Sequence, residues 1–447
     1  MKKQLLLSAL LGTLVLLTAA CSGSDDTKEE SKMESLTWNA DVREYSLTIS
    51  STGKWSAYSN VNWCSPLKSS GSGNATLNLW VSPNLTDKAR QGIVSISTPK
   101  GIRSIQVRQP AYTGDVDEYR YHLPVVFHVM YKDRTDEKQY VAQSQLAKII
   151  TEVNKLYEKN DLGIEFEMAK YDDKGNKLEE QGVIRHKVDF DECDADQFIN
   201  GKTKKNSTYA GYQQNLRRYI NIYLFRFKQE DDGTTMGITT MAIVPKTHPL
   251  DSLYATNDLN DYCYVDSPWG CCIDNNFIDA WQEEGTFNPT YIVTTVAHEL
   301  GHYLGLLHTF SEVECEWDDA CDDTHISDYE DYINYLTWLM KDKKTLYIED
   351  VTRRTDCKTG EEFLADNVMD YIYTYANVFS SQQRARTRHV LKYGPAVPGP
   401  KLIDYITSPA TTRGSGQQTA TRPTTARPCP RLPLEKKKGF PVREAGI

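Results

Sequence analysis

Residues 294–308 read TTVAHELGHYLGLLH, and this stretch decides the fold of the C-terminal part of the chain. His298 and His302 are four residues apart, so on a helix both side chains project from one face and can share a metal ion. Glu299 is rotated from them by one position, where its carboxylate can lie beside a metal-bound water without coordinating the metal. The apolar residues between them predict that one side of this helix is buried.

Gly305 provides the turn that a third ligand needs. It can adopt a positive φ, which ends the helix and turns the chain back, so that His308 reaches the same ion. Three neutral imidazoles leave a fourth tetrahedral position for water, which is the open arrangement of catalytic zinc. Five fixed residues at five fixed offsets arise by chance in roughly one such chain in 10⁵. We therefore predict one zinc ion held by His298, His302 and His308; the six other histidines lack this spacing and are predicted to be structural or solvated.

The pattern from His298 to His308 resembles the signature of the metzincins, which carry a Met-turn further downstream. Here the segment DNVMDY at 366–371 is its counterpart. Within that class, HTF at 308–310, CDDT at 321–324 and the 366–371 segment are most similar to the pappalysins. The strand LPVVFHV at 123–129 and the segment FSSQQ at 379–383 extend the resemblance over about residues 118–395. More specifically, the chain is similar to bacterial zinc-dependent metalloproteinase lipoproteins.

This resemblance implies a zinc endopeptidase, with Glu299 as the general base toward a zinc-activated water. It places Met369 beneath the metal as a hydrophobic base, and Tyr371 near the metal, where its hydroxyl can hydrogen-bond the oxyanion. Residues 372–377 would line the specificity pocket, and none of them is charged. We therefore expect an apolar or small side chain after the cleaved bond.

The chain departs from the pappalysin pattern between His308 and Met369. Residues 326–364 are longer than the family usually needs, and we expect them to add a helical insertion beside the primed side of the cleft. The resemblance suggests a disulfide between Cys321 and Cys357 that braces this region.

Clustered carboxylates lie in the same region, and pappalysins resembling this chain can bind calcium. Their hard oxygens suit that ion. No ligand spacing defines a site, so a solvated acidic loop is the alternative. The four residues are Asp318, Asp319, Asp322 and Asp323.

The first part of the chain has a different sequence pattern, in which apolar residues alternate with polar ones and turns separate the alternating segments. The strand-like segments 46–50, 75–81, 93–97 and 104–107 predict an all-β, Ig-like antiparallel sandwich over residues 36–112. The sequences GKWS, NWC, RQG and VRQ within it resemble the BACON family. That family has been proposed to bind carbohydrate or mucin, and a spacer role is the alternative. We expect Trp55 and Trp63 to be core residues rather than a sugar-binding platform.

The region after residue 117 mixes strands with helices. Buried-strand runs and amphipathic segments predict an α/β catalytic domain of metzincin type over residues 118–396. Residues 397–447 are rich in Thr, Arg and Pro and lack periodicity, so we predict a disordered basic tail. The whole chain is therefore expected to be multidomain, with the sandwich first.

The N-terminus has the features of a lipoprotein leader. Residues 1–20 carry Lys2, Lys3 and an apolar core too short to span a membrane, so they predict a signal peptide. The sequence LTAAC ends at Cys21, which resembles a lipobox cysteine that receives the lipid. The polar residues 21–35 predict a flexible tether. We expect an outer-membrane lipoprotein exposed on the bacterial cell surface; a periplasm-facing lipoprotein and ordinary secretion without lipid are the alternatives.

Charge and hydropathy exclude two classes of function. The formal net charge is −10, and loss of Lys2 and Lys3 with the leader makes it −12, which argues against nucleic acid as a partner. A mean hydropathy of −0.55 excludes a polytopic membrane protein. The expected partners are a protein or peptide substrate, glycans or mucin at the sandwich, and a membrane through the lipid alone. The rival interpretations are a glycan-binding adhesin with a vestigial metal site, and an amidase acting on peptidoglycan peptides.

Overall fold

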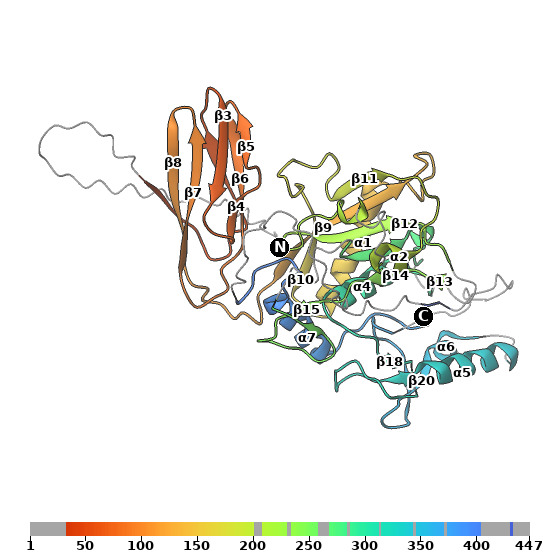
Figure 1. The fold of residues 1–447 in the computed structure, drawn as a ribbon. Coiled ribbons are helices and arrows are strands. Elements are labelled where there is room, and N and C mark those ends of the chain that lie inside the picture. Colours follow the sequence, from red (N-terminus) through yellow and green to blue (C-terminus); the bar gives the residue numbers. More distant parts are fainter. Residues whose placement is uncertain are drawn as a thin grey trace, which may run out of the picture. The chain divides into compact units, whose positions relative to one another are not determined.

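The computed structural model describes residues 33–200, 208–229, 234–257, 268–283, 287–312, 314–342, 346–370, 373–403 and 430–431 (Figure 1). The chain divides into two compact units. The N-terminal unit comprises Met1–Val116 with Asp173–Asn176, and the C-terminal unit comprises Asp117–Asp172 with Lys177–Ile447. The predicted leader, the lipidation cysteine Cys21 and most of the tether lie outside the described residues. In the described part, no helix has the length and apolar character needed to cross a membrane.

The N-terminal unit is a sandwich of two sheets, as its period-two sequence predicts. One sheet has the order β1-β8-β7-β3-β5 and the other the order β2-β6-β4. Its strands are β1 Glu34–Thr37, β2 Glu44–Ile49, β3 Lys54–Ser59, β4 Cys64–Pro66, β5 Ser70–Ser72, β6 Ala75–Val81, β7 Arg90–Thr98 and β8 Gly101–Gln109. Leu77, Leu79 and Val81 alternate along β6 and are buried between the sheets. Trp55 and Trp63 belong to the same core.

The C-terminal unit is built on a mixed sheet with the order β10-β9-β12-β17-β14, and β11 also pairs with β9. Its strands run parallel except β14, which is antiparallel to β17. The elements up to the metal-binding sequence are β9 Tyr121–Tyr131, α1 Gln143–Lys159, β10 Ile164–Met168, β11 Val183–Lys187, α2 Ala195–Asn200, β12 Ile220–Phe225, β13 Thr234–Thr235, β14 Gly237–Thr239, β15 Ile243–Val244, β16 Tyr254–Ala255, β17 Cys271–Asp274, the 3-10 helix η2 Asn275–Phe277 and α4 Ile292–Tyr303.

Helix α4 is the buried centre of this unit. It packs on β14 and β17 on one side and on α1 on another. Nearly all of its residues are buried, because the Met-turn segment lies against it as well. The hydroxyl of Tyr157 in α1 donates a hydrogen bond to the carbonyl oxygen of Ala297 at 3.0 Å, which joins the two helices.

The remaining elements follow the third predicted ligand. They are β18 Phe310–Ser311, β19 Ser327–Asp328, α5 Tyr329–Asp342, α6 Ile348–Thr352, β20 Arg353–Thr355, β21 Glu362–Leu364, α7 Ser381–Tyr393 and β22 Pro430–Arg431. The residues predicted as a helical insertion, 326–364, thus contain α5 and α6. Tyr332 and Leu336 of α5 pack in one apolar cluster with Phe310 and Tyr373.

The packed chain continues beyond residue 396, where the predicted tail begins. Val397 is buried, and Gly399, with a φ of 99°, lies so close to Tyr121 that a Cβ would come within 2.9 Å of that ring. The disordered tail was therefore predicted to begin too early. Residues 404–429 and 432–447 lie outside the described part.

The disulfide prediction was wrong in one partner. Cys357 is bonded to Cys315, with their Cα atoms 5.6 Å apart, whereas Cys321 is buried and carries no disulfide. The reason is local: the backbone N–H of Cys357 donates to the Ile326 carbonyl, and that of Cys315 donates to the Asp328 carboxylate. Both cysteines are therefore held against the same short segment, 326–328, and their spacing in the sequence does not reveal this.

Replacing Cys315 by Ser opens this bridge. The bridge joins residues 42 positions apart, so its loss should lower the free energy of unfolding by about 3–4 kcal/mol through greater freedom of the unfolded chain. Urea unfolding under non-reducing conditions measures the change. The control variant Cys321→Ser should leave a Cys315–Cys357 peptide detectable by mass spectrometry, and detection of a Cys321–Cys357 peptide in the unmodified protein would contradict the assignment.

Candidate metal centre

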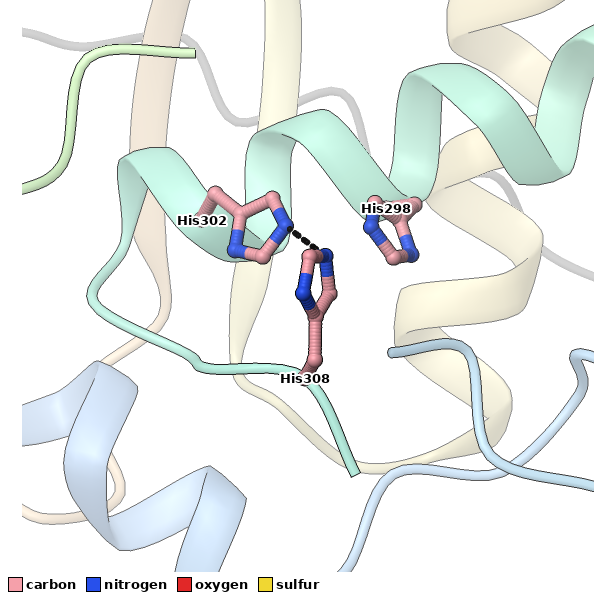
Figure 2. A group of neighbouring side chains, drawn as sticks. All are labelled: His298, His302 and His308. Carbon is pink, nitrogen blue, oxygen red and sulfur yellow. Dashed lines mark hydrogen bonds between the residues drawn. The ribbon is translucent and has the colours of Figure 1, made fainter. Parts of the chain in front are cut away.

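The three predicted ligands lie together in the structure. His298 and His302 are on α4 and are almost fully buried, and His308 comes from the segment that follows the helix. The ring centroids of His298 and His302 are 4.6 Å apart, and that of His308 lies 5.2 Å and 4.5 Å from them. Figure 2 shows the three rings turned toward one another, with one ligand atom from each lying within 4.8 Å of the others.

A turn at Gly305 brings His308 back to the helix. Gly305 has a φ of 91°, as its role in the sequence requires. Its N–H bonds to the His302 carbonyl and that of Leu306 bonds to the Gly301 carbonyl, which is the hydrogen-bond pattern of a Schellman C-terminus. The guanidinium of Arg386 in α7 donates to the Gly305 carbonyl oxygen at 3.2 Å and holds the turn in place.

Two backbone carbonyls determine which ring nitrogens are available to a metal. The Nδ1–H of His298 donates to the Val368 carbonyl at 2.7 Å, and that of His302 donates to the Leu306 carbonyl at 2.8 Å. In a neutral ring the other nitrogen, Nε2, then carries a lone pair. Nε2 of His302 lies within hydrogen-bond distance, 2.9 Å, of Nε2 of His308 (Figure 2), so these two ring nitrogens point into one common space.

The surroundings keep the rings of His302 and His308 neutral. Burial lowers the pKa of His302 to about 4, against the opposing effect of its hydrogen bond to Leu306. Desolvation lowers the pKa of His308 well below its usual value, and the neighbouring His302 and His298 rings add to the effect. Neutral imidazole is the form that binds a metal, and three convergent ring nitrogens next to a cavity lined by His298 fit a zinc ion with an open position.

Glu299 lies beside these rings and is 1% exposed. Its carboxylate oxygen Oε2 accepts a hydrogen bond of 2.6 Å from the hydroxyl of Thr239 in β14. Together with His298 and Thr295 it lines a cavity of about 40 Å³, which is larger than the space that a water molecule occupies. The carboxylate is therefore shielded from bulk solvent, and the cavity next to it has enough space for a reacting water molecule.

Met369 lies against the same helix. It is fully buried, and a Cβ added at Gly301 would come within 2.5 Å of its sulfur atom. The backbone N–H of Thr309 donates to the Met369 carbonyl at 3.3 Å, which ties the Met-turn to the segment after His308. This is the neighbourhood expected of a hydrophobic base. Tyr371, the predicted oxyanion donor, lies outside the described residues, so its role stays a prediction.

Part of the predicted specificity loop lines the cavity. Thr374, Tyr375 and Ala376 line it together with Thr294 of α4 and Phe287. Tyr373, in contrast, is buried in the apolar cluster of the insertion.

The four carboxylates proposed for calcium are used in different ways. Asp319 is buried and accepts hydrogen bonds from the Cys321 N–H and the Thr324 hydroxyl. Asp323 instead accepts from Ser380 and Gln382 at the start of α7. Within the described residues they do not form a three-ligand group, and calcium binding there stays a prediction.

A second group of potential ligands is formed by His122, Glu165 and Glu167 at the β9–β10 edge. Nδ1 of His122 lies 2.8 Å from Glu167, and Arg120 pairs with Glu165 at 3.1 Å. All three side chains are partly exposed and each carboxylate has a polar partner in these contacts, so we interpret them as a surface polar group.

Two contacts near the site have no counterpart in the sequence motifs. Thr239, which bonds Glu299, lies 60 residues before it. Arg354, buried in the insertion, donates to the Tyr373 carbonyl at 2.9 Å, and its Nε lies 3.8 Å from the Asp370 carboxylate. A threonine in a short strand and one arginine among many carry no recognisable spacing, so the sequence offers no signal for either.

Comparisons with known families agree with this geometry. Residues 277–392 match the peptidase M43 family described as pregnancy-associated plasma protein-A, and residues 143–309 match the reprolysin-like metallopeptidase family M12B. Residues 53–110 match BACON, described as a putative N-terminal binding domain. The C-terminal unit is therefore a metallopeptidase domain of the metzincin class, which comprises zinc metalloendopeptidases. More particularly, it is of the pappalysin type and follows a BACON domain.

Solved structures add little to this assignment, and no curated protein matches the chain significantly. The CupB2 chaperone of Pseudomonas aeruginosa is 16% identical over 19% of this chain and 55% of its own, with a TM-score of 0.16. A GH5 xyloglucanase of Bacteroides ovatus is 13% identical over 46% of this chain and 56% of its own, with a TM-score of 0.18. This chain thus spans little more than half of either structure, and TM-scores this low do not inform its fold.

Replacing Gly305 by Ala tests the turn. An alanine at positive φ costs about 1–2 kcal/mol, and here its Cβ would also lie 2.7 Å from Val390 and 3.0 Å from Leu253. We expect weaker zinc binding in a competition with a chelator, because His308 is displaced. The control is Gly360→Ala, which has a φ of 71° but no atom within 4 Å of the added Cβ; it should lose some stability and keep its zinc affinity. Equal zinc affinities in the two variants would contradict this account of the turn.

Proposed function

We propose that the protein is a zinc endopeptidase that hydrolyses extracellular proteins, with His298, His302 and His308 as the metal ligands and Glu299 as the general base. One observation carries the proposal: three imidazole rings converge beside a carboxylate that faces a small cavity. A structural zinc site would close the fourth position with a fourth protein ligand, whereas an open position beside a base is suited to hydrolysis.

The residues divide the chemistry among them. Zinc held by the three Nε2 atoms would polarise the scissile carbonyl and lower the pKa of a water molecule. The Glu299 carboxylate takes a proton from the attacking water and delivers it to the nitrogen of the leaving amine. In our proposal the Tyr371 hydroxyl donates a hydrogen bond to the carbonyl oxygen as negative charge develops on it, and Met369 supports the helix from below.

An extended substrate fits the edge of the sheet. Strand β14 ends the strand order of the main sheet and lies beside Glu299. A peptide lying along such a strand is held by backbone hydrogen bonds that do not depend on its sequence. Selectivity for particular substrate side chains then depends on pockets. The cavity beside His298 is our candidate for the pocket that accepts the side chain of the residue after the cleaved bond.

The lining of this cavity favours an apolar or small residue. Phe287, Pro289, Thr294 and Ala376 are uncharged. Besides the proposed base Glu299, the acidic group on its wall is Asp370, which is nearly buried and lies 3.8 Å from the guanidinium of Arg354, so it is not available to select a basic side chain.

The site of action follows from the leader. Residues 1–20 and Cys21 support secretion followed by lipid anchoring, and we propose that the enzyme acts at the surface of a bacterial outer membrane. The BACON domain suggests carbohydrate or mucin as a further partner. Trp55 and Trp63 are buried and cannot form the binding platform, so a glycan would have to bind elsewhere on this domain.

Two other functions are weighed against this one. An adhesin with a vestigial metal site does not need Glu299 together with a complete set of ligands, and the convergence of the three histidines next to this carboxylate supports the enzyme instead. An amidase that cleaves peptidoglycan peptides shares the metal chemistry but not the pairing of a third histidine with a Met-turn.

Replacing Glu299 by Gln should leave zinc content near one ion per chain and lower kcat for casein or gelatin fragments by about 10²–10⁴-fold, because the amide cannot accept the proton. Plasma emission spectroscopy and a fluorescent peptide assay measure the two quantities. Gln145→Glu, an exchange on α1 outside the cavity, serves as the control and should keep activity. Full activity in the Glu299→Gln variant would contradict the assigned base.

A peptide library distinguishes the rival functions. The protein should cleave extended peptides before an apolar or small residue, and a chelator should abolish the cleavage. Purified sacculi incubated in parallel should release no peptide fragments. Release from sacculi without library cleavage would favour the amidase, and binding to a glycan array without any hydrolysis would favour the adhesin.

A further inference from the structure

The carboxylate of Glu299 rests against two residues of strand β14. The Thr239 hydroxyl lies 2.6 Å from its Oε2 atom, and both side chains are almost completely buried. Gly237 lies against the other oxygen, since a Cβ at this position would come within 2.4 Å of Oε1. The two residues are two apart on a strand, so they face the same side, toward α4.

The sheet holds this strand in a fixed register. Gly237 pairs with Ile273 and Thr239 pairs with Cys271, both in β17. The thiol of Cys271 donates to the backbone carbonyl oxygen of Glu299 at a sulfur–oxygen distance of 3.7 Å. The strand that contacts the carboxylate and the helix that carries it are thus both attached to β17, which limits their relative motion.

We propose that Gly237 and Thr239 position the general base: the Thr239 hydroxyl fixes the rotation of the carboxylate by a charge-assisted hydrogen bond, and Gly237 leaves the space that the carboxylate occupies. A glutamate side chain has several rotatable bonds, and the cavity leaves room for it to turn away from the reacting water. A hydrogen bond to a single oxygen removes that freedom before the substrate arrives. The inference rests on the proposed endopeptidase function.

The alternative is that Thr239 only satisfies a buried polar contact and has no effect on catalysis. Its neighbour Thr240 provides the comparison. Thr240 is also buried, and its hydroxyl bonds with the backbone of Gly270 instead of Glu299, at 3.4 Å to the carbonyl oxygen and 3.3 Å to the nitrogen. Removing either hydroxyl leaves a polar partner without its bond, but only Thr239 contacts the base.

The experiment compares Thr239→Val, Thr239→Ser and Thr240→Val in the full-length zinc enzyme. Thr239→Val should lower kcat about 10- to 100-fold, the range expected for a misplaced catalytic group, with KM unchanged within about twofold. Thr239→Ser keeps the hydroxyl and should recover most of kcat. Thr240→Val should lower the unfolding midpoint with little change in kcat. Zinc stoichiometry and chelator-derived zinc affinity should be the same in all three.

Gly237→Ala is a second test of the same position. Its added methyl group should displace the carboxylate and lower kcat while zinc remains bound. Wild-type kcat in Thr239→Val, no recovery in Thr239→Ser, or an equal loss of kcat in Thr240→Val would each overturn the proposal.

Wild type and Glu299→Gln are assayed in the same series to separate the two levels of inference. If wild type cleaves no peptide, or Glu299→Gln is fully active, both the proposed function and the positioning role are overturned. If these two behave as expected and Thr239→Val retains wild-type kcat, only the positioning role is overturned.

Discussion

The approach of His302 and His308 to 2.9 Å between their Nε2 atoms is the constraint on which the rest of the catalytic unit depends. The Nδ1–H of His302 is used by the Leu306 carbonyl, so its Nε2 can only accept, and burial holds the ring neutral. Two ring nitrogens this close need a hydrogen or a metal ion between them, and the surrounding structure must enforce their approach. The turn at Gly305, held by its own backbone hydrogen bonds and by Arg386, provides that enforcement.

Each side of α4 contributes a different form of support. Tyr157 of α1 bonds the Ala297 carbonyl, Cys271 of the sheet bonds the Glu299 carbonyl, and Met369 fills the space beside Gly301. A side chain at position 301 would occupy the space of the Met369 sulfur. The close packing of the Met-turn against α4 therefore requires the glycine in the metal-binding motif. Because two of the ligands sit on a helix fixed on several faces, these contacts hold the geometry of the site.

The parts of this protein that could be predicted from sequence are those in which local spacing determines geometry. His298, His302 and His308 lie within one helix and the turn that ends it, and the alternating strands of the sandwich bury their residues by the same local rule. Contacts between distant segments could not be predicted. Cys357 bonds to Cys315 because segment 326–328 holds both cysteines, which are far apart in the sequence. Thr239 contacts Glu299 from a three-residue strand 60 positions earlier. Neither contact leaves a periodic pattern in the sequence.

The insertion is coupled to the cavity through a buried charge. The Arg354 guanidinium lies over the Tyr332 ring at 3.2 Å and donates to the Val351 carbonyl, both within the insertion, while it also donates to the Tyr373 carbonyl and pairs with Asp370. A buried cation is stable only where all of these partners stay in place, since leaving it unpaired costs about 3–5 kcal/mol. Asp370 directly follows Met369, and Tyr373 precedes the residues that line the cavity. The packing of α5 and α6 therefore bears directly on the wall of the cavity beside Glu299, which joins the insertion to the candidate site.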